Sequence, residues 1–192
     1  TESYPQASII RYHFPGNGSR PQVALTWYDG GLMPERPEEL EEGRAMGGAL
    51  GGLLFIGDKG KIMCGSHGAD GVRLIPESRM KDYAKPPKTL ARSIGHHREW
   101  IEACKGDKKT LCNFDYSGAL IEHNLLALVS YRLGKPGKRT EKSADKNAPP
   151  KEEDVTLGMK LEWDAPSLKA TNCPDADQYI TKKYRDGWVL NG

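Results

Sequence analysis

The chain has 192 residues, about the length of one domain, and a single core can bury enough surface to fold at this size. Apolar residues make up 37% of the chain and charged residues 28%, which indicates a globular domain rather than a disordered one. Lys and Arg number 28 against 26 Asp and Glu. This balance excludes a broad basic surface for nucleic acid and a polybasic stripe for a membrane. No apolar run approaches the roughly 18 to 20 residues that cross a bilayer, and we expect neither a membrane span nor a signal peptide.

The first half of the chain carries the signals of strands. Five runs are rich in β-branched, aromatic or aliphatic residues: 7–14, 22–29, 52–56, 61–64 and 72–75. The first two flank a Gly- and Pro-rich turn, and the next two flank Gly57-Asp58-Lys59-Gly60, so each pair predicts an antiparallel hairpin. In the first hairpin two sets of apolar residues each share a face: Ile10, Tyr12 and Phe14, and Val23, Leu25 and Trp27. Residues 30–48 predict a long loop.

The second half changes to helical spacing. Apolar residues recur at three and four residues after Ser93, which predicts a helix capped by Ser93 and ended by Gly106. A longer helix is predicted from Asp115 to Leu133, and a last amphipathic helix over 174–185. Residues 135–158 are dense in both charges and carry no aromatic residue, so we expect a charged, flexible excursion.

Strands followed by helices indicate an α+β domain. The prediction is one open, mixed but mostly antiparallel sheet with helices packed on one face. The other face is then left for solvent or for a partner.

No complete catalytic set is recognisable from the sequence. The glycine-rich stretch at 47–52 precedes a strand rather than a helix, which indicates a turn and not a phosphate cradle. His96 and His97 are adjacent on a predicted helix and point about 100° apart, so they do not easily bind one metal. Either one of them faces a cleft and binds a hydroxyl group, or both are structural.

Two further features leave alternatives open. Trp27, Tyr28 and Asp29 form either an aromatic and carboxylate platform for a sugar, or a core tryptophan with a turn-forming aspartate. The four cysteines lack the spacing of a zinc site and indicate free thiols. A disulfide between Cys104 and Cys112 is the alternative.

Several stretches keep one order along the chain: Trp27–Gly31, Gly52–Ile62, Arg92–Gly106, Asn113–Gly118, Leu161–Asp164, Asn172–Ala176 and Tyr184–Trp188. Together they resemble the Gfo/Idh/MocA oxidoreductases, the family of glucose-fructose oxidoreductase and inositol dehydrogenase. The resemblance covers nearly the whole chain except the charged excursion. It implies an open mixed sheet whose free face builds an oligomer interface.

In that family a Rossmann domain comes first and binds NAD or NADP, and the reaction oxidises a secondary alcohol of a sugar or cyclitol. A Glu-Lys-Pro motif and an Asp-x-x-x-His motif usually supply the catalytic residues. This chain contains neither motif. We therefore expect no catalytic, cofactor-binding or metal-binding residue in it.

The resemblance implies a single C-terminal domain over 1–192, with the N-terminal Rossmann domain absent and NAD or NADP bound only by the full-length parent. We expect it to contribute part of the substrate pocket and the interface of a homo-oligomer, either in the cytoplasm or exported to the periplasm. Five residues are expected to contact the sugar or cyclitol: Arg92, His96, His97, Trp27 and Tyr28. The alternatives are an NAD-dependent glycoside hydrolase parent, and a stand-alone, non-catalytic oligomerisation or carbohydrate-binding module.

Overall fold

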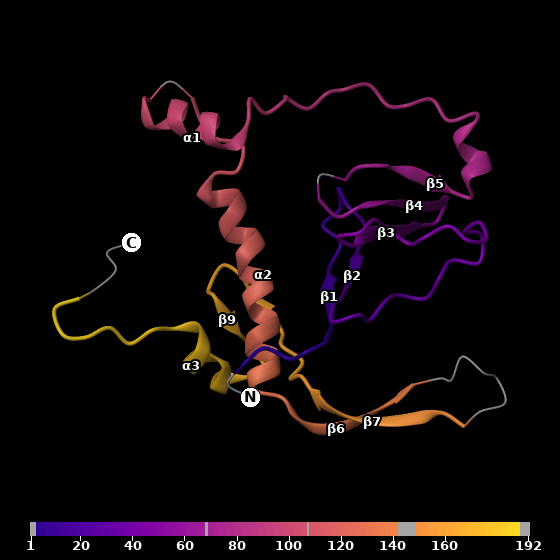
Figure 1. Ribbon diagram of the computed structural model, residues 1–192. Coiled ribbons are helices and arrows are strands. Elements are labelled where there is room, and N and C mark those ends of the chain that lie inside the picture. Colours follow the sequence, from indigo (N-terminus) through magenta and orange to yellow (C-terminus); the bar gives the residue numbers. More distant parts are fainter. Residues whose placement is uncertain (1–2, 68, 107, 142–148, 189–192) are drawn as a thin grey trace. The chain divides into compact units, whose positions relative to one another are not determined.

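The computed structural model describes residues 3–67, 69–106, 108–141 and 149–188 (Figure 1). The chain divides into two compact units. One unit, Ala7–Arg92, is called the strand unit below. The other, Thr1–Gln6 with Ser93–Gly192, is called the helix unit. That both belong to one domain over 1–192 stays a prediction.

The strand unit holds the first five strands. They are β1 (Ile9–Phe14), β2 (Val23–Tyr28), β3 (Gly52–Gly57), β4 (Gly60–Gly65) and β5 (Arg73–Ile75). A short 3-10 helix, η1 (Glu77–Met80), follows β5. β1 and β2 form an antiparallel ribbon, and β3, β4 and β5 form an antiparallel sheet in that order. Both predicted hairpins and the predicted loop over 30–48 are confirmed.

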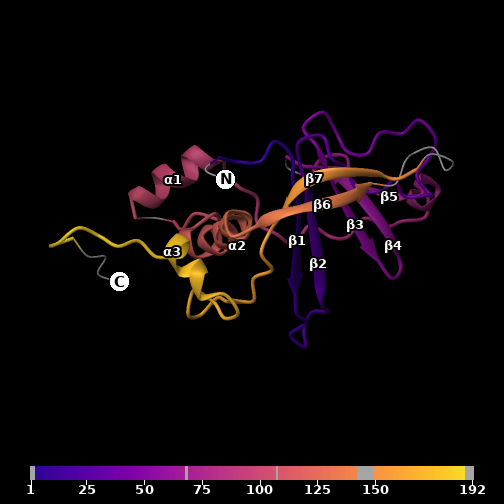
Figure 2. The same cartoon turned by 90° about the horizontal axis from the view of Figure 1, so that it is seen from below.

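The β1–β2 ribbon has one wholly apolar face, as its sequence predicts. The register sets three pairs opposite one another: Ile10 and Trp27, Tyr12 and Leu25, Phe14 and Val23. The members on β2 are the more exposed, with 42% of Val23, 40% of Leu25 and 55% of Trp27 accessible. Figure 2 shows the two strands side by side as an extended ribbon.

The core of the strand unit lies on one face of the three-stranded sheet. Met63 from β4 and Ile75 from β5 are buried against Leu40, which the long loop supplies. The guanidinium group of Arg36 donates to the carbonyl oxygens of Leu40, Glu41 and Arg44, which holds this loop in a tight arc. A side-chain cation thereby satisfies carbonyl groups that regular structure would otherwise bond.

Two backbone segments meet closely where the loop enters β3. Gly48 and Gly51 exchange backbone hydrogen bonds of 2.9 and 3.1 Å, which closes a tight turn. A Cβ atom added at Gly52 would lie 2.6 Å from the Cα atom of Gly47, and one at Gly47 would lie 2.8 Å from the Cα atom of Gly52. Gly47 also has a φ of +84°, which favours glycine. The predicted turn over 47–52 is confirmed.

The helix unit is built around the longest helix. Its elements are α1 (His96–Cys104), α2 (Phe114–Arg132), β6 (Lys135–Glu141), β7 (Lys151–Leu157), β8 (Trp163–Asp164), β9 (Lys169–Ala170), η2 (Pro174–Ala176) and α3 (Asp177–Ile180). Asn113 caps α2 by accepting a hydrogen bond of 3.0 Å from the backbone of Tyr116. A small core forms where the end of α2 meets β9 and η2, from Val129, Ala170, Cys173 and Ala176.

The first two of the three helices predicted in this unit are confirmed, and two details differ. α1 begins after Gly95 without a side-chain cap, and the hydroxyl of Ser93 accepts from Gly95 instead of capping the helix. The last predicted helix, over 174–185, ends at Ile180 because Thr181 is extended, with φ −99° and ψ 139°. Residues 182–185 are all exposed, so continuing the helix would bury nothing.

The predicted single open sheet is wrong. Strands in the described residues form four small antiparallel sheets of two or three strands, and every pairing joins strands that are neighbours in sequence. The mixed α and β composition stands. Glycine-rich turns fix the two predicted hairpins locally, and in the described residues no ladder joins the edge of one hairpin to the next.

The charged segment contains two strands that the sequence analysis did not predict. Within 135–158, β6 and β7 pair along their whole lengths, while 142–148 lies outside the described residues. Charges of opposite sign meet across the ribbon, with Lys138 3.0 Å from Glu152 and Arg139 3.5 Å from Glu153. Figure 2 shows these two strands as a long ribbon. In the part of the chain that the structure describes, no helix is long and apolar enough to cross a membrane.

Replacing Ile75 with Ala should lower the free energy of unfolding by about 2–5 kcal/mol, because it removes a side chain that is only 2% exposed. Urea denaturation measures the loss. Ile56→Ala on the same sheet is the matched control, since Ile56 is 69% exposed, and it should cost less than about 1 kcal/mol. Equal losses in the two variants would show that the core does not lie at β5.

Candidate substrate-binding residues

Trp27 and Tyr28 stand at the end of β2, beside a hydrogen-bonded aspartate. The carboxylate of Asp29 accepts from the backbone N–H of Ser8 at 2.6 Å, from its hydroxyl at 2.9 Å and from Nε1 of Trp27 at 3.1 Å. Both carboxylate oxygens therefore already have donors. Asp29 thus joins the ends of β1 and β2, and its carboxylate is not left free to accept from a sugar hydroxyl.

The hydrogen bond to Asp29 also determines which part of Trp27 can contact a ligand. Its indole N–H is already donated, yet 55% of the residue is accessible. The exposed part is therefore an apolar ring surface, suited to stacking on the C–H face of a sugar. Tyr28 is half-buried opposite Ile9. Of the two parts of the predicted sugar platform, the structure contains the aromatic surface but not a free carboxylate.

His96 and His97 are the first two residues of α1, and both side chains are exposed. Neither histidine packs into a core. Adjacent helical residues diverge by about 100°, so the two rings face different directions. In the described residues no group of three His, Cys, Asp or Glu side chains gathers where it could hold a metal ion.

Glu99 is the one charged residue classed as buried in the described chain, and it lies one turn from the histidines. The hydroxyl of Ser93 donates to its carboxylate, and the backbone N–H of Leu111 donates at 3.2 Å. These two bonds, and then the charge of His96, hold the pKa of Glu99 below its ordinary value of 4.5, against the opposing effect of burial. Glu99 thereby ties α1 to the segment that leads into α2.

Arg92 is the last residue of the strand unit. It is exposed and lies in residues 84–95, which form no helix or strand. The five predicted residues therefore fall at three places in the chain: the end of β2, residue 92 and the start of α1. Their role as substrate contacts stays a prediction.

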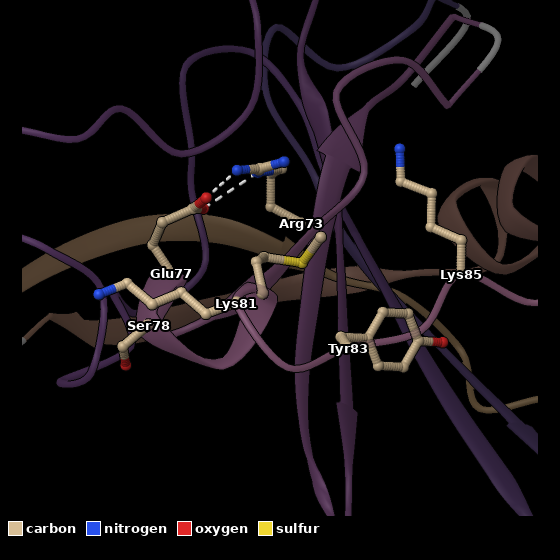
Figure 3. Close-up of a pocket in the computed structure, with 7 residues that line it drawn as sticks. Arg73, Glu77, Ser78, Lys81, Tyr83 and Lys85 are labelled. Atoms are coloured by element: carbon tan, nitrogen blue, oxygen red, sulfur yellow. Dashed lines mark hydrogen bonds and ion pairs between the residues drawn. The ribbon is translucent and has the colours of Figure 1, made fainter.

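A pocket that the sequence analysis did not predict lies beside η1. Its volume is about 370 Å³, and its lining residues are Arg73, Glu77, Ser78, Met80, Lys81, Tyr83 and Lys85. Figure 3 shows Tyr83 and Lys85 on one side, Glu77, Ser78 and Lys81 on the other, and Arg73 between them. The available signal was the run at 79–92, which holds five cationic residues and a single acidic one.

Ion pairs order the wall of this pocket. Glu77 accepts from Nε of Arg73 at 3.0 Å and also from its Nη2, which gives a bidentate pair. Arg44 reaches the same carboxylate at 3.2 Å and Glu41 at 3.0 Å. Bidentate pairing fixes the plane of a guanidinium group.

The glycine-rich turn at 47–52 does not have the usual setting of a dinucleotide phosphate site. Phosphates of such a cofactor are held at a helix N-terminus that follows a glycine-rich turn. Here the turn at 47–52 leads into β3. The comparison with protein-family models and the comparison with curated proteins give no match for this chain.

Glu99→Gln should lower the thermal midpoint at pH 7, and the deficit should shrink as the pH falls to 3. Because the folded state depresses the pKa of Glu99, the carboxylate stabilises the fold above pH 4.5 and loses that effect as the pH falls through the folded value. Thermal unfolding at several pH values checks this.

Glu102→Gln on the same helix is the control. It keeps the Glu99 carboxylate, so its thermal midpoint should still fall with pH as that of the wild type does. A Glu99→Gln variant with the wild-type midpoint at every pH would show that its hydrogen bonds to Ser93 and Leu111 do not form.

Proposed function

We propose that this chain is the C-terminal domain of an NAD(P)-dependent oxidoreductase of the Gfo/Idh/MocA type. The parent would act on a secondary alcohol of a sugar or cyclitol. The main support is the end of β2, where Trp27 presents an accessible ring while Asp29 fixes its indole N–H. A rigid aromatic surface of this kind suits a sugar ring. The order of the motif-bearing stretches along the chain also supports the proposal.

The chain supplies contacts rather than chemistry. It lacks the Glu-Lys-Pro and Asp-x-x-x-His motifs, and its glycine-rich turn does not suit a dinucleotide. The nucleotide would therefore be bound by a Rossmann domain of the parent. In this proposal Trp27 and Tyr28 of the strand unit offer an aromatic surface to a sugar. Arg92, His96 and His97 are each proposed, separately, as hydrogen-bond donors to a hydroxyl group.

The second role of the chain is an interface between copies. Away from the end that carries Trp27, one face of the β1–β2 ribbon is apolar, and Val23 and Leu25 on β2 are 42% and 40% accessible. A continuous apolar face on a strand pair is unfavourable in water and is commonly covered by a partner. A homo-oligomer that buries this face removes it from solvent.

Leu25→Glu should therefore shift the protein towards the monomer, with a dimerisation constant weakened at least about tenfold, because a carboxylate would be buried without a partner. Analytical ultracentrifugation over a concentration series measures the shift. Thr26→Glu is the matched control, since Thr26 is exposed on the opposite face of the same strand. A wild-type chain that is monomeric throughout the series would exclude this interface.

The reaction itself is tested in the protein that joins this chain to its nucleotide-binding domain. That protein should quench or enhance NADH or NADPH fluorescence on binding, and it should reduce the oxidised cofactor with at least one sugar or cyclitol. Binding of neither dinucleotide would refute the proposal. A glycoside hydrolase parent would instead release free sugar without net reduction of the cofactor.

The histidines are tested in the same assay. Changing His96 and His97 together to Ala should raise the KM for the substrate about tenfold and leave the Kd for the cofactor unchanged, since the hydrogen bond that one of them makes to the substrate is lost. His13→Ala is the control, because His13 is exposed on β1 of the strand unit. An unchanged KM would remove both histidines from the site.

A further inference from the structure

We infer that the pocket beside η1 binds an anionic ligand of monosaccharide size, with a carboxylate or a phosphate as its charged group. The pocket lies wholly within the strand unit and is formed by β5, η1 and the segment that follows. The inference does not depend on the reaction of the parent.

The charges around the pocket do not cancel. Arg44 and Arg73 share the carboxylate of Glu77, and Arg44 also pairs with Glu41, so two cations and two anions balance. Lys81 and Lys85 remain, and neither has a salt-bridge partner among the residues that the structure describes. Two uncompensated ammonium groups at one cavity attract an anion.

The surrounding chain adds to this field. Residues 79–92 carry five Lys and Arg residues, and the single acidic residue among them, Asp82, does not line the pocket. Arg73 is held in place by its bidentate pair with Glu77, and its guanidinium group has more donors than that pair uses. An anion beside Arg73 therefore meets an oriented donor, with the side chains of Lys81 and Lys85 on either side of it (Figure 3).

Size and the remaining lining indicate the rest of the ligand. A volume of about 370 Å³ is near the lower end of the range for small-molecule pockets, which suits one sugar ring better than an oligosaccharide. The ring of Tyr83 and the thioether of Met80 offer apolar contact. The hydroxyl groups of Ser78 and Tyr83 both donate and accept, as sugar hydroxyls require.

Isothermal titration calorimetry of the 192-residue chain at low salt tests the inference with three probes: glucuronate, glucose 6-phosphate and glucose. Saturable binding is expected for at least one of the two anions and not for glucose. The stronger of the two identifies the source of the charge, a sugar acid or a phosphosugar. Binding should weaken as salt is added.

Lys85→Gln and Lys81→Gln should each weaken binding of the preferred anion about fivefold or more, since each removes one charge from the pocket. Lys59→Gln is the matched control, because Lys59 is exposed in the β3–β4 turn of the same unit and lies outside the pocket. Both pocket lysines are exposed, and circular dichroism verifies that the variants fold.

Three results would overturn the inference. They are no saturable binding of either anion, equal binding of glucose, and an effect of Lys59→Gln as large as that of Lys85→Gln. The last result would indicate a diffuse attraction by surface charge and not a site.

Discussion

The carboxylate of Glu77 receives two arginine side chains, and the arrangement of the strand unit depends on this meeting. Arg73 comes from β5 and Arg44 from the long loop, while Glu77 itself begins η1. Exposed pairs of this kind contribute only about 0–1 kcal/mol each, but here they join three segments at one point. The loop thereby presents Leu40 to Ile75, and the chain beyond η1 forms a pocket wall.

The proposed site and the proposed interface draw on opposite features of one ribbon. At the end of β2, hydrogen bonds to Asp29 fix the indole of Trp27 and leave its ring accessible. Further from that end of the same strand, Leu25 and Val23 have no such polar anchor and carry only apolar surface. Burial in an oligomer would protect that surface, while the strand end stays open to a ligand.

Local signals in the sequence predicted the hairpins and α2, because turn residues and helical spacing act within a few residues. Pairing between hairpins has no such signal, so the single sheet was predicted wrongly. At 135–158 the composition did not indicate the two strands, because it counts charges but not which of them face each other, and Arg139 stands opposite Glu153. The pocket was not predicted because its residues come from β5, η1 and the segment after them, and only the fold brings them together. Arg73 and Glu77 are four residues apart, but they lie in a strand and a 3-10 helix and not in one α-helix.

The close approach of Gly47 and Gly52 restricts which substitutions this chain can accept. Each residue occupies the space that a side chain on the other would need, so replacing either one displaces the other's backbone. A second substitution cannot repair the first, because it adds a further atom to the same gap. The two positions are therefore constrained together, while Ala49 and Leu50 between them are exposed and free to vary. In a library of folded variants, positions 47 and 52 would keep glycine, while the turn residues between them would accept substitutions.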